Sequence, residues 1–350
     1  GYLTTDSMHL TSDMYNINLR FPNDTISIRN SQLKMDHIEA YAAGKSPLVI
    51  DGTMDLTDLS HIQTNLGIKA SNYELINAPR ERGKLAYGKV FVDINAMLRG
   101  VLDDLKIRGR LTVLGNTDVT YVLKDSPITV DDQLSGLVTF VDFNDSIESE
   151  ETANLDMQHI DMQMTLAIEQ AAQVHCLLSE DGTDYVELEG GGNLNLTYDP
   201  QNDLRLQGRY TILKGRMNYT MLSIVCKNFD IEGGSYVEFQ GDIGNPKLQI
   251  SARERLKASV AENNVPRSVA FDVGLNISRT LKDMGLEFII KAPENQTIAD
   301  ELQSKTAEER GKLAVTMLTT GMYLTENNTS SFTMNSALSS FLQQEINKIA

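Results

Sequence analysis

Apolar and polar residues alternate along most of the chain, from about Ile17 to about Ile290. In the segment Ser268–Ser278, every second residue is apolar and the residues between them are mostly small or polar. Side chains on a β-strand point to opposite faces in turn, so this spacing places the apolar side chains on one face. The same spacing in Lys89–Leu98 and His159–Ile168 predicts a long sheet with one apolar and one polar face.

Short turn sequences separate the strand-like runs, for example Asp51-Gly52, Gly115-Asn116 and Gly233-Gly234. Their spacing predicts about 18 strands, joined by connections too short for a helical crossover, so we expect neighbouring strands to pair as hairpins in a meander. The run Gly190-Gly191-Gly192 is not followed by a helical pattern. We therefore expect a bulge or a sharp bend there, and not a phosphate-binding loop.

The alternating pattern ends near Thr297. Thr306 and Glu309 have the spacing of a capping box, a helical stripe follows, and Gly321 is suited to end that helix. A second amphipathic stripe spans Leu338 to Ile349. The sequence thus predicts an all-β region over residues 1–296 and a helical tail over residues 297–350.

The net charge of −17 disfavours binding to nucleic acids, and no run of Lys and Arg offsets it. Tryptophan is absent and aromatic residues make up only 6% of the chain, so the apolar face is mainly aliphatic. No stretch reaches the ~20 apolar residues of a membrane-spanning helix. Because the chain opens directly in strand-like sequence at Gly1, we expect any targeting or anchoring segment to lie upstream.

We find no catalytic motif, and the five histidines His9, His37, His61, His159 and His175 are scattered. Cys176 and Cys226 have no metal-ligand spacing, and two buried thiols are favoured over a disulfide without excluding it. The acidic stretch 144–156 lacks the ordered spacing of a calcium loop, which favours an exposed loop. We therefore expect neither enzymatic activity nor a cofactor or metal.

Residues 208–252 carry a distinctive order of motifs. Gly208-Arg-Tyr-Thr-Ile-Leu-Lys-Gly215 is followed by Phe229-Asp-Ile-Glu-Gly-Gly-Ser235 and then by Gly241-Asp-Ile-Gly-Asn-Pro246. Together with Glu308–Leu324 and Ala337–Leu342, this order resembles the C-terminal domain of the TamB family, the inner-membrane subunit of the translocation and assembly module. The family usually places Pro directly after Gly-Asp, and this chain departs from it at Ile243-Gly244.

The resemblance covers residues 200–350 and implies an elongated, incompletely closed, taco-like trough of mostly antiparallel strands with short C-terminal helices. It implies a periplasmic protein, anchored to the inner membrane, that shields the acyl chains of phospholipids on their way to the outer membrane. The candidate groove lining is Val90, Val92, Ile94, Leu105, Ile107, Leu111, Val113, Ile160, Met162, Met164, Leu166, Leu204, Leu206, Tyr210, Ile212, Phe229, Ile231, Val237, Phe239, Leu248, Ile250, Val269, Phe271, Val273, Leu275, Ile277, Leu286, Phe288 and Ile290.

Three other hypotheses compete with that of a lipid conduit. The chain could be an assembly factor that docks an outer-membrane barrel insertase of the TamA type by strand addition. It could be a polysaccharide lyase on a β-helix, although clustered Asp, Lys and Arg on one sheet face are missing. It could also be a structural module whose apolar faces form its own core. The candidate docking residues for the insertase are Leu313, Met317, Leu318, Leu338, Phe341, Leu342 and Ile346.

Overall fold

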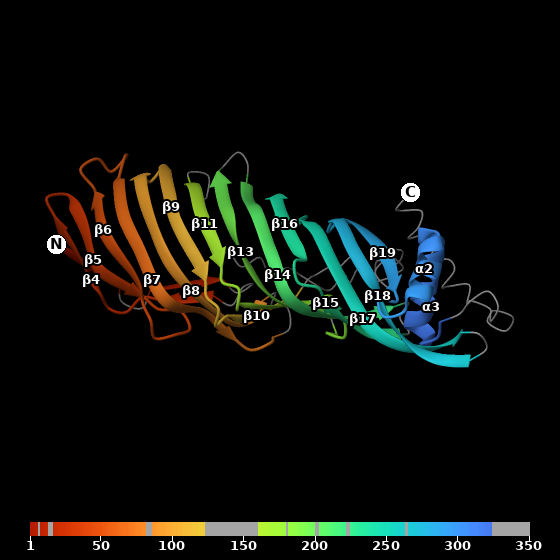
Figure 1. Cartoon of the computed structure of the whole chain (residues 1–350). Coiled ribbons are helices and arrows are strands. Elements are labelled where there is room, and N and C mark those ends of the chain that lie inside the picture. The colour runs from red at the N-terminus through yellow and green to blue at the C-terminus, as the bar shows by residue number, and fades with distance from the viewer. Residues whose placement is uncertain are drawn as a thin grey trace, which may run out of the picture.

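The structure is a computed structural model that describes residues 1–5, 8–12, 17–81, 86–122, 160–179, 181–199, 203–221, 225–262 and 265–323. These residues form nineteen strands and two helices, arranged as an elongated molecule with the helices at one end (Figure 1). The predicted acidic loop at 144–156 and the predicted second helical stripe at Leu338–Ile349 lie outside the described residues.

The first ten strands are β1 (Tyr2–Thr4), β2 (His9–Ser12), β3 (Ile17–Arg20), β4 (Thr25–Arg29), β5 (Gln32–Ala40), β6 (Leu48–Asp55), β7 (Gln63–Ala78), β8 (Ala86–Val101), β9 (Asp104–Val113) and β10 (Asp118–Val122). They are followed by β11 (Ile160–Ile168), β12 (Gln173–Leu177), β13 (Tyr185–Asp199), β14 (Asp203–Met221), β15 (Val225–Ile231), β16 (Tyr236–Gly241), β17 (Lys247–Glu262), β18 (Val265–Thr280) and β19 (Asp283–Lys291). The helices are α2 (Gln296–Ser304) and α3 (Ala307–Thr320).

Seventeen of these strands form one continuous sheet, which is not closed into a barrel. Almost all its neighbours are antiparallel, as the short turns predicted. The prediction of hairpins throughout is wrong at one junction, where β9 pairs with β11 and β10 with β12 in parallel. Residues 123–159 separate these strands, and a connection of this length can return the chain to the same end of the sheet. Hairpin turns cannot do so.

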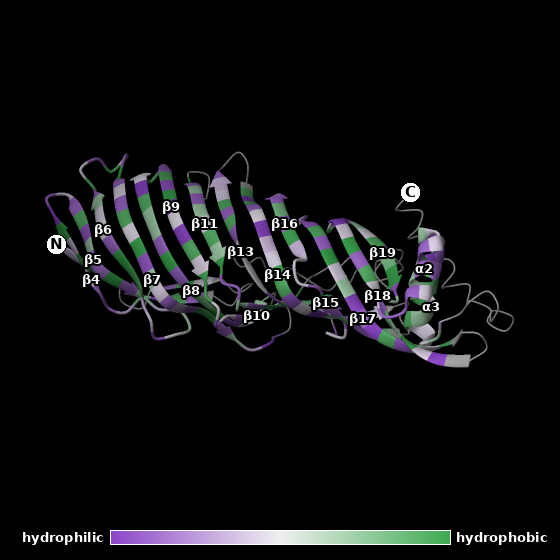
Figure 2. Ribbon diagram, in the orientation of Figure 1, coloured by the Kyte–Doolittle hydropathy of each residue, from purple (hydrophilic) through white to green (hydrophobic). Residues whose placement is uncertain are grey.

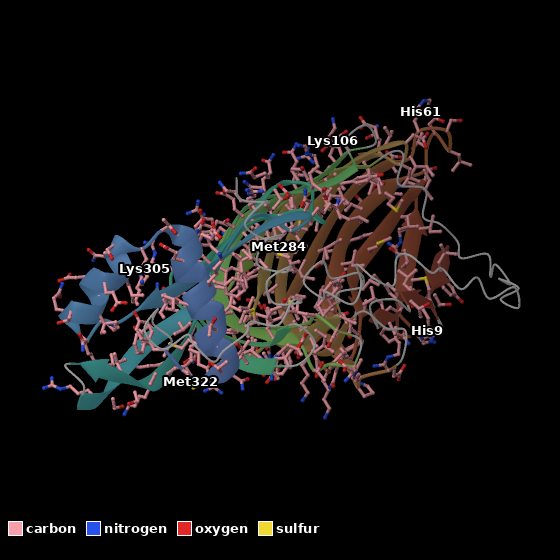
Figure 3. The ribbon with its side chains drawn as sticks, turned by 90° about the vertical axis from the view of Figure 1, so that its right-hand side faces the viewer. His9, His61, Lys106, Met284, Lys305 and Met322 are labelled. Atoms are coloured by element: carbon pink, nitrogen blue, oxygen red, sulfur yellow. The ribbon has the colours of Figure 1, made fainter. Side chains whose placement is uncertain are left out.

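A crease runs across the part of the sheet between β9 and β16. Three four-residue turns, Leu114–Thr117, Glu169–Ala172 and Glu232–Ser235, interrupt what would otherwise be continuous strands. In each turn the N–H of the last residue donates to the carbonyl of the first, over 3.0, 3.1 and 3.2 Å respectively. The sheet therefore bends along one line and becomes a trough, which Figure 3 shows along its length.

The glycines Gly190 and Gly192 lie on this crease, where the pairing of β13 with β14 shifts between Glu189 and Gly190. A Cβ added at Gly190 would lie 2.2 Å from the carbonyl oxygen of Thr211, and one at Gly192 would lie 2.1 Å from that of Arg209. Only glycine allows the two strands to approach this closely. The predicted bulge is confirmed, and its cause is this close backbone contact.

The helical tail begins at Gln296, with Asn295 as the N-cap of α2. The predicted capping box of α3 is confirmed, because Thr306 accepts from the N–H of Glu309 and the Glu309 carboxylate accepts from the N–H of Thr306. Gly321 ends α3 in the left-handed conformation. Helix α3 packs on β18 and β19 and stands across one end of the trough (Figures 1 and 3).

Candidate functional site

The register of the sheet brings apolar residues of six strands into rows that cross the trough. One row runs through Leu48, Ala70, Ile94, Leu111, Leu166 and Leu194. A second row runs through Leu66, Leu98, Ile107, Met162 and Tyr198. Cross-strand partners share a face, so the apolar positions of separate strands combine into one surface. Figure 2 shows the alternation along each strand.

Between β8 and β11 this surface is partly exposed, and part of it packs around the buried Tyr73. The candidate lining residues there are half-buried, except for Val92, which is 1% exposed. The half-buried residues are Val90, Ile94, Leu105, Ile107, Leu111, Val113, Ile160, Met162, Met164 and Leu166. We call this part of the apolar face the open section. A contiguous aliphatic surface that stays partly exposed is unusual for a protein without an apolar ligand or partner.

From β14 to β19 the same face is closed. Phe271 and Val273 are fully buried in one core together with Ala314, Val315 and Met317 of α3. We call this part the closed section. Its buried candidate residues are Leu206, Tyr210, Ile212, Phe229, Ile231, Leu248, Val269, Phe271, Val273, Leu275, Ile277, Phe288 and Ile290. Val237, Phe239, Ile250 and Leu286 are half-buried, and Leu204 is exposed.

The candidate docking residues of α3 face this core. Met317 and Leu318 are buried, and Leu313 is half-buried and packs against the same cluster. A partner could reach Met317 and Leu318 only if α3 left the sheet. Leu338, Phe341, Leu342 and Ile346 lie outside the described residues.

One ion pair lies on the apolar face. The Nζ of Lys227 is 3.3 Å from the Oε2 of Glu254, and the two side chains are 19% and 24% exposed. The pairing of β17 with β18 puts Glu254 opposite Val273. Sequence reasoning missed this pair, although Lys227 and Glu254 occupy apolar positions in the alternation of their strands, which was the available signal.

Three ionisable groups of the apolar face, Cys176, Tyr210 and Tyr73, stay uncharged near neutral pH. Burial raises the pKa of the Cys176 thiol to about 11 and the pKa of Tyr210 to about 12. Burial likewise raises the pKa of Tyr73 to about 12, and its hydroxyl donates to the carbonyl of Ala40 over 3.3 Å. The thiol and the two phenols therefore add no charge to the apolar face near neutral pH.

The opposite face carries a charged ladder. His175, Glu187, Arg216 and Asp230 are successive cross-strand partners, beside a concavity of about 510 Å³. Its charged groups pair with one another: His175 Nδ1 lies 3.7 Å from Glu187 Oε1, and Arg216 Nε lies 3.9 Å from Asp230 Oδ1. Such pairs stabilise a solvated sheet face and form no nucleophile–base arrangement.

The described residues contain no group of three or more His, Cys, Asp or Glu side chains arranged to hold a metal ion. Cys176 and Cys226 are both free thiols. Cys176 pairs with Val186 on the apolar face, whereas Cys226 is exposed and its thiol donates to Asn218 over 2.7 Å.

Neither α2 nor α3 is long and apolar enough to cross a membrane. None of the curated proteins compared with the chain matches it. The family model of the TamB C-terminal domain, in contrast, matches residues 36–349, which include almost the whole trough and both helices. The chain therefore belongs to the TamB family of non-enzymatic cell-envelope transport and assembly proteins, and it contains the C-terminal domain of that family.

Proposed function

We propose that the trough binds the acyl chains of phospholipids and shields them from water in the periplasm, as part of a protein anchored to the inner membrane. The observation that carries this proposal is the open section, where aliphatic side chains of β8, β9 and β11 form one partly exposed surface. Acyl chains match this surface in chemistry, because neither has hydrogen-bonding groups to satisfy.

The free energy gained by burying an acyl chain is large enough to hold a lipid in the trough. Burying one CH₂ group contributes about 0.8 kcal/mol, so a chain of ~16 carbons gains on the order of 10 kcal/mol before the cost of ordering it. The rows of the open section present similar aliphatic positions from strand to strand. Neighbouring binding positions therefore differ little in energy, and a bound chain can move along the trough.

The test uses two faces of the same strand. Met164 is half-buried on the apolar face of β11, and its neighbour Gln163 is exposed on the polar face. Protein would be purified without detergent from a Gram-negative host, and its lipids extracted and quantified by mass spectrometry. We expect phospholipid with the parent chain and with Gln163→Arg, and several-fold less with Met164→Arg. Equal lipid in both variants, or none with the folded parent, would refute the proposal.

A second function is favoured by one further observation. The described residues pair β19 with β18, at the end of the molecule that carries the helices (Figure 1). A strand at the end of a sheet is where another protein can extend that sheet by strand addition. We propose that an outer-membrane barrel insertase of the TamA type docks here. Loss of insertase co-purification after Lys291→Pro in β19, with lipid content unchanged, would support it, whereas unchanged co-purification would refute it.

A further inference from the structure

We propose that the strand face beneath α3 is a second acyl-chain site, which α3 occupies in this structure and vacates when lipid enters. This proposal rests on the proposed function, because it assigns to the closed section the ligand proposed for the open section. It adds that α3 and an acyl chain compete for one surface.

A series of cross-strand partners links the closed section to the open one. Gly192 of β13 pairs with Tyr210, Tyr210 with Val237, and Val237 with Leu248. Further along, Ala252 of β17 pairs with Leu275, and Leu275 pairs with Phe288. The face under α3 is therefore the same aliphatic face, and what distinguishes it from the open section is its cover.

The second half of α3 is buried around its whole circumference, and α3 packs on β18 and β19. Five consecutive residues, Ala314 to Leu318, are each at most 7% exposed. At about 100° per residue they extend around the whole circumference of the helix. Directly after the helix, Tyr323 stacks on Phe271 of β18 with ring centroids 4.9 Å apart, and its hydroxyl donates to Glu301 of α2. The helix thus covers strand residues whose counterparts in the open section stay partly exposed.

Two features within α3 weaken the helix, although both of its ends are capped. Gly311 lies in the helix, and a Cβ added there would meet nothing within 4 Å, so packing does not require glycine at this position. Thr316, Thr319 and Thr320 donate their hydroxyls to backbone carbonyls one turn earlier. Glycine and threonine with such bonds both weaken a helix. Lys305 and Thr306, both extended, join α3 to α2 and provide a joint about which α3 can leave.

The experiment labels both sections in one reaction. The purified chain would be mixed with a fatty acid that carries a photoreactive diazirine, illuminated, digested and analysed by mass spectrometry. Labelled peptides of β11 report the open section, and labelled peptides of β18 and β19 report the site beneath α3. Two substitutions change, in opposite directions, the fraction of molecules in which α3 covers β18 and β19.

Gly311→Ala strengthens the helix, and we expect it to lower labelling of β18 and β19 by about two- to five-fold. Tyr323→Ala removes the stack on Phe271, and we expect it to raise that labelling by a similar factor. Labelling of β11 stays constant in both variants. Gly244→Ala, in the exposed turn between β16 and β17, is the matched control and changes neither section.

Failure of this inference differs from failure of the proposed function. Labelled β11 with unlabelled β18 and β19, or with labelling there that Gly311→Ala does not lower, overturns the second site and leaves the open section as the binding surface. A chain that is labelled in neither section overturns both. The Gly311→Ala arm stabilises the fold, so the test does not depend on whether Tyr323→Ala folds fully.

Discussion

The ammonium group of Lys227 lies 3.3 Å from the carboxylate of Glu254 on the otherwise apolar face of the trough. A half-buried charge there depends on its partner, because removing one member leaves the other in an apolar environment. We expect Lys227→Met to lower the free energy of unfolding by about 3 kcal/mol. The double variant Lys227→Met/Glu254→Leu should regain most of this loss, measured by urea denaturation. Equal destabilisation in the single and double variants would contradict this account.

The crease depends on glycine at Gly190. An added methyl group would collide with the carbonyl oxygen of Thr211 at 2.2 Å, and strain of this kind in a sheet is among the severe effects of single substitutions. We expect Gly190→Ala to destabilise the chain by more than about 2 kcal/mol. Gly311→Ala, where no atom lies within 4 Å, is the control and should be neutral or stabilising. Unfolding followed by circular dichroism measures both.

The thiol of Cys176 should react slowly while the protein is folded. Its pKa is raised to about 11 by burial, against 9.0 for a free thiol, so the reactive thiolate is about 100-fold rarer at pH 8. We expect alkylation of Cys176 in a Cys226→Ser variant to be slower than in urea by at least that factor. Mass spectrometry after timed quenching measures the two rates, and equal rates would show that the thiol is accessible.

The same shift makes stability depend on alkaline pH. The unfolded chain loses the Cys176 proton near pH 9, whereas the folded chain keeps it to about pH 11. The unfolded state is therefore favoured progressively as pH rises from 9 to 11. In the Cys226→Ser background, we expect Cys176→Ala to show a weaker loss of stability over this range, measured by urea midpoints at several pH values. Identical slopes would assign the loss to other groups.

Removal of α3 should expose the closed section. Truncation before Thr306 uncovers Phe271 and Val273, which are fully buried in the intact chain. We expect several-fold higher fluorescence of an apolar dye, because a continuous aliphatic face becomes accessible. If α3 also carries the docking of the insertase, co-purification of that protein is lost in the same variant. Dye fluorescence equal to that of the full chain would show that α3 does not cover this face.

The alternation of Val269, Phe271 and Val273 correctly predicted a strand with one apolar face, and the spacing of Thr306 and Glu309 correctly predicted a capped helix. Both signals are local, since they depend on neighbours in the chain. The pattern could not distinguish the open section from the closed one, because Met162 and Met164 alternate in the same way as Phe271 and Val273. Phe271 and Val273 are buried in one core with α3, and that contact joins residues about 40 positions apart in sequence.

The crease and the parallel junction were not predictable for a related reason. Leu114–Thr117 and Glu169–Ala172 each resemble ordinary turns between strands. They form one crease only because two backbone hydrogen bonds join them. The N–H of Gln173 donates to the carbonyl of Thr117, and the N–H of Glu169 donates to the carbonyl of Val113. These hydrogen bonds exist through the pairing of β9 with β11 and of β10 with β12, across residues 123–159.

The parallel junction also separates two kinds of strand pairing in the folding of the sheet, local pairings and one long-range pairing. On either side of it, most strands pair with close neighbours in the chain, so these contacts form early and at low entropic cost. The pairing of β9 with β11 and of β10 with β12 instead requires closure of a loop that contains residues 123–159. This seam therefore carries the largest loop-closure cost in assembling the sheet, and the local hairpins on each side can form without it.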